Sequence, residues 1–391
     1  MSKKFLNNLN YFFISILIIF AFYLSYIGGY GSDEDTLPMI GTFEAILNSG
    51  AIMTSRFTGY PVAEFGIGFL SYNFGSFTAN FVTFSLLVVS LIFIFLTFNS
   101  DKKNLKYLLS LFLLLCLTNP IIFFENIEPI DYSWSLAPFA IGSYFYKKRI
   151  YELSLLFFCL SIGARLNFAL FIIIFIFLYN NNNFTLKRKI IFIICTLFLG
   201  SLFYLPTWYT FKFGFDWVSA ARPIDQGLYG LLGRFFYKII NLYTFFSFIF
   251  ILIITINKNF ILKFFNDRVI FFIFLSNLLL FLWIPAELSY LLLGLIIFYF
   301  FLIKNISTKK ILALILLNFS TWFVQFDFLE IKYKDKINEC SSPNAISAIV
   351  KFTVEDGSII KFIETRSKIK CWLEGADPER INKILNGAAL K

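Results

Sequence analysis

The first candidate for chemistry is an acidic run near the N-terminus, in the sequence Gly-Ser-Asp-Glu-Asp-Thr at positions 31–36. Its consecutive carboxylates, Asp33, Glu34 and Asp35, follow the first long apolar stretch. A carboxylate can take the proton of a hydroxyl group that attacks a carbon centre. Asp33 and Asp35 can instead share a hard divalent cation, Mg²⁺ or Mn²⁺, with water ligands. If the backbone is extended, Glu34 points to the opposite side. The plain alternative is a solvated acidic loop.

The residues after this run add an arginine, a tyrosine and a further carboxylate. Residues 37–47 predict a short amphipathic helix that lies on a membrane surface. The sequence Ser-Arg-Phe-Thr-Gly-Tyr-Pro at 55–61 then supplies Arg56 and Tyr60, and Glu64 leads into the next apolar stretch. Arg56, Tyr60 and Glu64, together with Glu34, are therefore candidate substrate-binding residues.

The composition restricts the other catalytic groups. The chain has no histidine, which removes the commonest general base at neutral pH and the commonest metal ligand. Three of the five cysteines lie inside apolar runs and are expected to pack there, whereas Cys340 and Cys371 lie in a polar segment. These two can form a disulfide if that segment is extracytoplasmic. No phosphate-binding loop, zinc spacing or serine-centred elbow is found.

The composition of the chain predicts a polytopic membrane protein. Hydrophobic residues make up 58% and charged residues 15%, the mean hydropathy is +0.75, and the net charge is +10. Several apolar runs approach the length of about 20 residues that crosses a bilayer as a helix. Lys and Arg concentrate in short loops between these runs, as expected for loops on the cytoplasmic side. Membrane topology therefore explains the positive charge better than nucleic-acid binding does.

Charge placement predicts about 11 membrane helices in residues 1–325. The N-terminus is cytoplasmic and the first helix is an uncleaved anchor. Residues 29–77 form the catalytic first outer loop, and the chain returns to the cytoplasmic side through 78–98. The apolar run 153–179 has basic residues at both ends, so we expect it to break at 163–167 into a hairpin of two short helices. Residues 326–391 form a small extracytoplasmic α+β segment with a predicted hairpin, 348–354 and 358–363, around Asp356-Gly357.

This topology places three arginines, Arg56, Arg165 and Arg222, in the outer half of the protein. They are candidates for binding an anionic group, and the alternative for each is a structural ion pair with an outer carboxylate. The second outer loop offers Glu125 and Asp131. Glu287 and Tyr290, in Pro-Ala-Glu-Leu-Ser-Tyr at 285–290, resemble a substrate-contacting turn, although Pro285 can equally mark a helix start.

The order of acidic run, short helix, arginine, Gly-Tyr-Pro and return to the membrane resembles the GT-C superfamily of membrane glycosyltransferases. The matching pieces are GSDEDT at 31–36, GTFEAILNSG at 41–50 and SRFTGYP at 55–61. The resemblance implies transfer of a sugar from a polyprenyl-phosphate donor to a glycan, lipid or protein acceptor outside a bacterial inner membrane. It implies Asp33 or Asp35 as the general base or as a metal ligand, and an acidic residue of the second outer loop, Glu125 or Asp131, in the site.

Two other classes remain open at this point. A transporter or flippase of a lipid-linked saccharide or another anion would use the same arginines and would need a cavity reachable from both faces. A non-catalytic assembly partner would have no pocket around Asp33.

Overall fold

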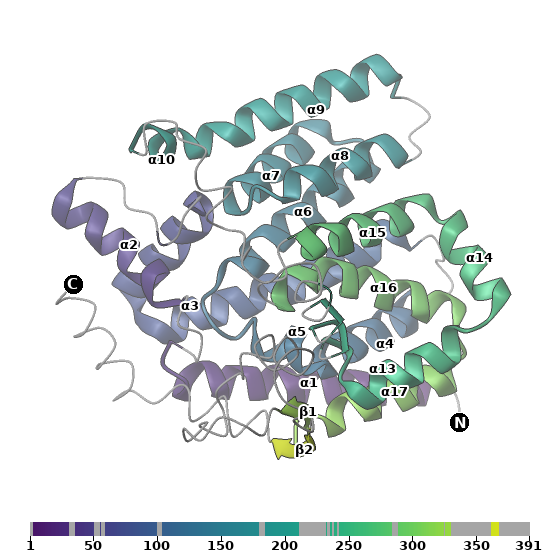
Figure 1. The fold of residues 1–391 in the computed structure, drawn as a ribbon. Coiled ribbons are helices and arrows are strands. Elements are labelled where there is room, and N and C mark those ends of the chain that lie inside the picture. The colour runs from purple at the N-terminus through teal and green to yellow at the C-terminus, as the bar shows by residue number, and fades with distance from the viewer. Residues whose placement is uncertain are drawn as a thin grey trace, which may run out of the picture.

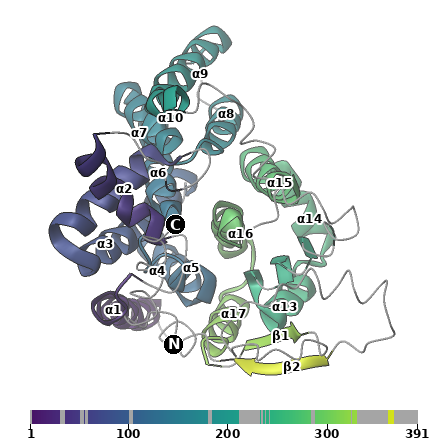
Figure 2. The same cartoon turned by 60° about the vertical axis from the view of Figure 1, so that its left-hand side comes forward.

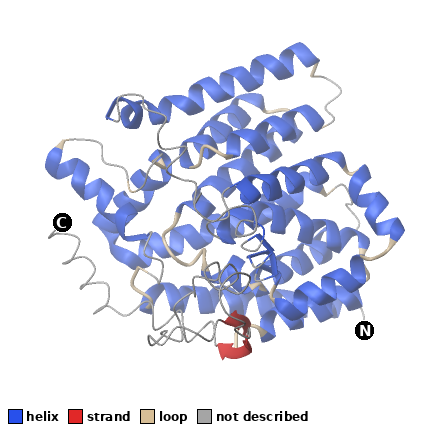
Figure 3. Ribbon diagram, viewed as in Figure 1, coloured by secondary structure: helices blue, strands red, loops and turns tan. Residues whose placement is uncertain are grey.

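The structure is a computed structural model. It describes residues 3–30, 36–50, 55, 59–99, 104–179, 184–210, 232, 235–236, 238–240, 242–283, 288–323, 325–329 and 361–366. The described chain is almost entirely helical (Figures 1 and 3). This agrees with the apolar stretches of the sequence, because a helix satisfies every backbone hydrogen bond within its own segment.

The first half of the chain forms the helices on which the candidate site depends. They are α1 (Lys3–Ile27), α2 (Thr36–Ser49), α3 (Pro61–Phe98), α4 (Leu105–Thr118), α5 (Pro120–Phe124), α6 (Asp131–Lys148), α7 (Tyr151–Ala164) and α8 (Phe168–Leu178). The long helix α3 packs along α6. The indole nitrogen of Trp134 on α6 donates to the Thr83 hydroxyl on α3 at 3.1 Å, which fixes the register of the two helices.

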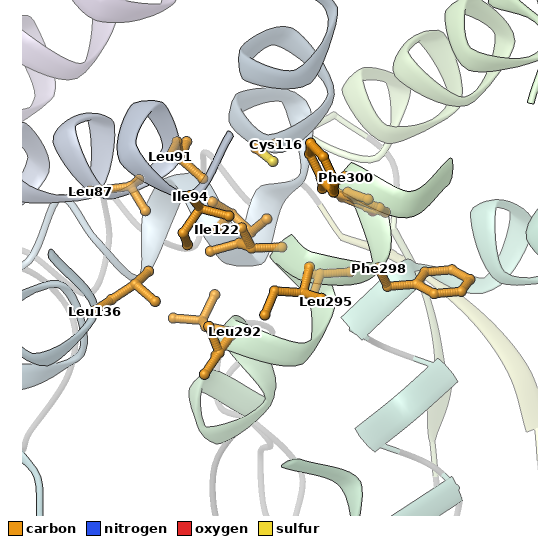
Figure 4. Packing of buried hydrophobic residues seen from close by; sticks show 14 of the residues in the cluster. Leu87, Leu91, Ile94, Cys116, Ile122, Leu136, Leu292, Leu295, Phe298 and Phe300 are labelled. Atoms are coloured by element: carbon orange, nitrogen blue, oxygen red, sulfur yellow. The ribbon is translucent and has the colours of Figure 1, made fainter. Parts of the chain in front are cut away.

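The second half adds a further series of helices. They are α9 (Leu186–Ser201), the 3-10 turn η1 (Leu202–Tyr204), α10 (Leu205–Thr210), α13 (Phe245–Thr255), α14 (Lys258–Asn266), α15 (Arg268–Trp283), the 3-10 turn η3 (Leu288–Leu291), α16 (Leu292–Asn305) and α17 (Thr308–Ser320). In Figure 2, α16 lies in the middle of the other helices. Every residue from Leu292 to Ile303 is buried, as expected for a helix that is apolar on all sides. Its residues pack against α3, α4, α5 and α6 (Figure 4).

The described helices support a membrane-embedded protein. Three are long and apolar enough to cross a bilayer: Phe5–Ile27, Pro61–Phe98 and Leu186–Tyr209. The bent pair Phe246–Thr255 and Lys258–Asn266 makes a fourth if it counts as one span. Other apolar helices, such as Leu105–Thr118 and Phe168–Leu178, are shorter. The eleven crossings expected from the sequence therefore remain a prediction.

Two boundaries differ from the sequence prediction. Helix α3 begins at Pro61, so much of the predicted outer segment 29–77 is already helical. The helix deviates only at Gly75, whose φ of 78° and ψ of −178° lie in a region essentially restricted to glycine. Lys258, Lys263 and Arg268 predict a cytoplasmic loop after the apolar run 235–256, but the structure has the helix α14 there, at 91° to α13.

The predicted break inside the apolar run 153–179 is confirmed. Helix α7 ends at Ala164, Arg165 is extended (φ −153°, ψ 119°), and α8 begins at Phe168. Gly163 permits the close packing of this end, because a Cβ there would lie 2.7 Å from both Val62 and Phe203. The break therefore leaves Arg165 between two helix ends that are both held by neighbouring elements.

The described part of the C-terminal segment contains two strands. β1 (Gln325–Leu329) pairs antiparallel with β2 (Lys361–Arg366), with Gln325 opposite Arg366 and Leu329 opposite Lys361. β2 overlaps the second strand of the predicted hairpin. The first predicted strand, 348–354, and both Cys340 and Cys371 lie outside the described residues.

Basic side chains hold the helix ends on one side of the bundle. The Lys147 ammonium, at the end of α6, donates to the carbonyls of Leu96 (2.8 Å), Thr97 (2.7 Å) and Asn99 (3.0 Å) at the end of α3. Lys189, in the first turn of α9, does the same for Phe177 and Tyr179 at the end of α8. Terminal carbonyls lack partners within their own helix and carry partial negative charge, so a lysine there is favourable.

We expect Lys147→Met to lower the free energy of unfolding by about 1–3 kcal/mol, because partly buried carbonyls would lose a charged donor. Lys148→Met is the matched control, since Lys148 is the exposed neighbour on the same turn. Detergent-solubilised variants would be compared by thermal unfolding. Equal transition temperatures for the two variants would contradict the assignment.

Candidate functional site

The centre of the candidate site is a buried ion pair between Arg165 and Asp131. The Arg165 Nε donates to the Asp131 Oδ2. Arg165 lies at the break between α7 and α8 and is 4% exposed, and Asp131, the first residue of α6, is fully buried. Two charges withdrawn from solvent in this way are compatible with a folded protein only when they compensate each other. The ion pair is the alternative that the sequence left open for Arg165.

Three tyrosine rings surround the guanidinium group of Arg165. Its central carbon lies 4.0 Å from the ring centre of Tyr132, 4.7 Å from that of Tyr290 and 5.4 Å from that of Tyr60. All three distances are within the range of cation–π attraction. The rings come from α6, η3 and the residue that precedes α3, so one arginine joins three elements that are distant in the sequence.

Glu64 connects this centre to the first predicted outer loop. It lies in the first turn of α3 and is 5% exposed. Its Oε1 accepts hydrogen bonds from the Ser55 backbone N–H at 2.8 Å and from the Ser55 hydroxyl. Ser55 is the first residue of the sequence SRFTGYP at 55–61, and Tyr60, the residue before its final proline, lies next to Arg165. The two ends of that sequence are therefore held against the start of α3.

Helix α2, which follows the acidic run, packs against the same region. Met39 on α2 forms a small buried cluster with Ala63 and Ile67 of α3 and with Ala164, the neighbour of Arg165. The Thr36 hydroxyl, at the start of α2, donates to the Tyr30 carbonyl at 3.2 Å. Burial raises the pKa of Tyr30 above its ordinary value. The residues on either side of the acidic run are thus fixed close to the site.

The turn η3 brings the predicted second outer loop and a late helix together. The Ser289 hydroxyl donates to Glu125 Oε2 at 3.2 Å, and Tyr290 lies on Arg165. Tyr204 of η1 is also buried, and its hydroxyl donates to the Ile162 carbonyl at 2.8 Å. Tyr204, Tyr132 and Ser289 were not among the site residues predicted from the sequence. Tyr132 could have been found from its position next to Asp131.

A narrow pocket lies beside the ion pair. It has room for about one water molecule. One part of its wall is polar: Tyr132, Ser135, Arg165, Asn167, Asn277, Ser289 and Tyr290. The other part is apolar: Leu136, Phe168, Phe171, Leu292 and Leu293. The pocket therefore lies between the charged and aromatic group around Arg165 and an apolar wall formed by α6, α8 and α16.

Asn277, in the middle of the apolar helix α15, holds the turn that supplies Tyr290 and Ser289. Its amide nitrogen donates to the Tyr290 carbonyl, and its amide oxygen accepts from the Gly294 N–H, both at 2.9 Å. Asn277 is 2% exposed. One side chain thus bonds to η3 and to the first turn of α16, and it satisfies backbone groups that would otherwise be buried without a partner.

We expect Asn277→Leu to release η3 at a cost of about 1–3 kcal/mol. The measurement is the labelling rate of a Ser289→Cys thiol, with Cys195, Cys340 and Cys371 replaced by serine. Labelling should accelerate by at least about fivefold, because local opening becomes easier. Asn305→Ala, at the opposite end of α16, is the control. An unchanged rate in the Asn277→Leu variant would contradict this role.

The structure brings together five of the predicted site residues: Tyr60, Glu64, Asp131, Arg165 and Tyr290. Glu125 joins them through Ser289. The other predicted positions lie outside the described residues: Asp33, Glu34, Asp35, Arg56, Arg222 and Glu287. Within the described part of the chain, no group of three or more Cys, Asp and Glu residues is arranged to hold a metal ion.

Six helices around the site are arranged in the same way: one end of each helix faces the site, and basic residues lie beside its other end. They are α3, α6, α7, α8, α9 and α16. For example, α6 runs from Asp131 to Lys147 and Lys148, and α16 runs from the turn that carries Tyr290 to Lys304. The candidate site and the basic residues therefore occupy opposite ends of the bundle.

No family model, no curated protein and no solved structure matches the chain.

Proposed function

We propose that the chain is a membrane glycosyltransferase of the GT-C kind. It would move a sugar from a polyprenyl-phosphate donor to a glycan, lipid or protein acceptor on the extracytoplasmic face of a bacterial inner membrane. The observation that carries the proposal is the convergence of Tyr60, Glu64, Asp131, Arg165 and Tyr290 at one end of the bundle. Helix α2, which begins directly after the acidic run, packs against this cluster.

The charge distribution supports an extracytoplasmic site. Lysine and arginine side chains near helix ends favour the cytoplasmic side. In this bundle they lie at the ends away from Arg165, such as Lys147 at the end of α6 and Lys189 at the start of α9. A site at the other end would face the outer leaflet, where a lipid-linked sugar donor can enter from the membrane.

In the proposed reaction, Asp33 or Asp35 takes the proton of the acceptor hydroxyl as its oxygen attacks the anomeric carbon. The bond from that carbon to the donor phosphate breaks, and the departing polyprenyl phosphate carries the negative charge. A cation must stabilise this charge. Because Arg165 is already bonded to Asp131, we assign phosphate binding to Arg56 and Arg222 and assign Arg165 to shaping the site. Aromatic faces such as those of Tyr60 and Tyr290 suit a sugar ring.

The proposal allows a divalent cation. Asp33 and Asp35 would hold Mg²⁺ or Mn²⁺, and the ion would neutralise the leaving phosphate.

The test is mass spectrometry of the surface glycans of a strain that lacks the gene. We expect one glycan species to lose the mass of a single sugar, and expression of the wild-type chain to restore it. Unchanged glycan masses would contradict the proposal. Complete glycan precursors that accumulate at the inner leaflet would instead indicate a flippase.

A further inference from the structure

Helix α14 makes a right-angled turn at the end of the bundle that carries the basic residues. It lies at 91° to α13 after a break at Ile256 and Asn257. The Asn257 side chain caps it by accepting from the Asn259 N–H at 2.9 Å. In Figure 1, α14 lies at the edge of the bundle and connects α13 with α15. Where the axis of α13 lies along the membrane normal, this angle sets α14 parallel to the membrane plane.

One face of α14 is fixed to the core of the protein. Phe260 is 8% exposed and packs edge-on against Phe301 of α16, with 5.2 Å between the ring centres. Phe264 contacts the same ring at 5.0 Å and also Phe298. These contacts attach α14 to the half of α16 that ends at Lys304, so its position relative to the bundle is defined.

The opposite face of α14 is apolar and uncovered. Ile261, Leu262 and Phe265 are 45%, 49% and 52% exposed. The apolar surface continues into α13, where Ile253 and Ile256 are 67% and 76% exposed. Exposed apolar surface that is continuous with a membrane helix is expected to contact lipid rather than water.

Exposed basic residues lie on α14 and on the neighbouring helices. Lys258, Lys263 and Arg268 are exposed, and so is Lys304 on the neighbouring helix α16. Asp267 is the carboxylate of the same segment, and its Oδ1 accepts from the Ile270 N–H at 3.5 Å at the start of α15. The surface of α14 therefore combines an apolar side with excess positive charge, which is complementary to anionic lipid.

We propose that α14 is an interfacial helix that binds anionic phospholipid headgroups on the membrane face opposite the candidate site. Ile261, Leu262 and Phe265 enter the boundary of the acyl chains, while Lys258 and Lys263 contact headgroup phosphates. By helical spacing, Lys258 lies on the same side of α14 as Ile261 and Phe265, so its methylene stem runs along the apolar boundary and its ammonium reaches the phosphates. Lys263 lies on another side of the helix. The inference does not depend on the proposed enzymatic function.

The depth of α14 can be measured with a nitroxide label at Phe265→Cys, in the full chain with Cys195, Cys340 and Cys371 replaced by serine. The protein is reconstituted in bilayers of phosphatidylglycerol and phosphatidylcholine. The label should be accessible to dissolved oxygen and protected from a water-soluble nickel complex. Preferential access of the nickel complex would overturn the proposal. Spin–spin broadening between labels of two copies would also overturn it, because a second protein molecule would then cover the face.

The headgroup preference is tested by native mass spectrometry of the purified chain titrated with phosphatidylglycerol or phosphatidylcholine. Lys258→Gln with Lys263→Gln should weaken binding of phosphatidylglycerol by roughly fivefold for each lysine and leave phosphatidylcholine binding unchanged. The control, Lys309→Gln with Lys310→Gln, removes the same charge from the start of α17. Equal losses of phosphatidylglycerol binding in the two double variants would show that binding depends only on the total positive charge. That result would overturn the assignment to α14.

Discussion

Replacing Arg165 with methionine is expected to lower the free energy of unfolding by about 3–5 kcal/mol, because the fully buried Asp131 would keep its charge without its partner. The same change removes the cation from the faces of Tyr60, Tyr132 and Tyr290. The measurement is unfolding of the purified protein in mixed micelles by titration with a denaturing detergent, followed by the fluorescence of its tryptophans.

The control is the double variant Asp131→Asn with Arg165→Met, in which neither charge remains. We expect it to be more stable than Arg165→Met alone, because the uncompensated buried charge is gone. Arg165→Lys should recover only part of the stability, since a lysine lacks the planar group that stacks on the tyrosine rings. If the single and double variants were equally destabilised, Arg165 and Asp131 would not be coupled, and the centre of the site would be wrongly assigned.

The sequence predicted the position of Arg165 but not its partners. Basic residues at both ends of the run 153–179 required a break, because one helix cannot begin and end on the same side of a membrane. The break at Arg165 follows from that rule and the structure confirms it. Its contacts with Asp131, Tyr132 and Tyr290 depend on how α6, α7 and η3 pack together, and no local pattern encodes that packing.

The sequence did not predict the start of α3 or the helix α14, because polar and basic residues within these segments are typical of loops. The stretch before Thr78 contains Ser71, Asn73 and Gly75, which lowered its hydropathy and suggested a loop. In the structure these residues lie within a helix that departs from helical geometry only at Gly75. The lysines of α14 similarly suggested a connecting loop. An apolar stripe at helical spacing, with Phe260 and Phe264 on one side, could have indicated the helix.

The substitution with the largest expected effect on activity is Asp33→Asn combined with Asp35→Asn. A general base contributes about 10²–10⁴-fold to a reaction rate, so removing both candidates should reduce sugar transfer by at least that factor. The same substitutions would remove both ligands of a divalent cation, so the expected loss does not depend on which role the pair has. Asparagine keeps the size and the polarity of aspartate, so membrane insertion and protein level should be unchanged.

The matched control is Glu44→Gln. Glu44 lies on the exposed side of α2, in the same outer segment as the acidic run, and it contributes no group to the proposed reaction. Its variant should transfer sugar at the wild-type rate. A loss of transfer in Glu44→Gln equal to that of the aspartate variant would point to a general requirement for negative charge in this loop.

The most direct test is to express the Asp33→Asn, Asp35→Asn variant in the strain that lacks the gene, at wild-type membrane levels, and to measure its surface glycans by mass spectrometry. The account predicts glycans that lack the same sugar as those of the deletion strain. Complete glycans of wild-type mass would contradict it, because the acidic residues would then have no part in the transfer.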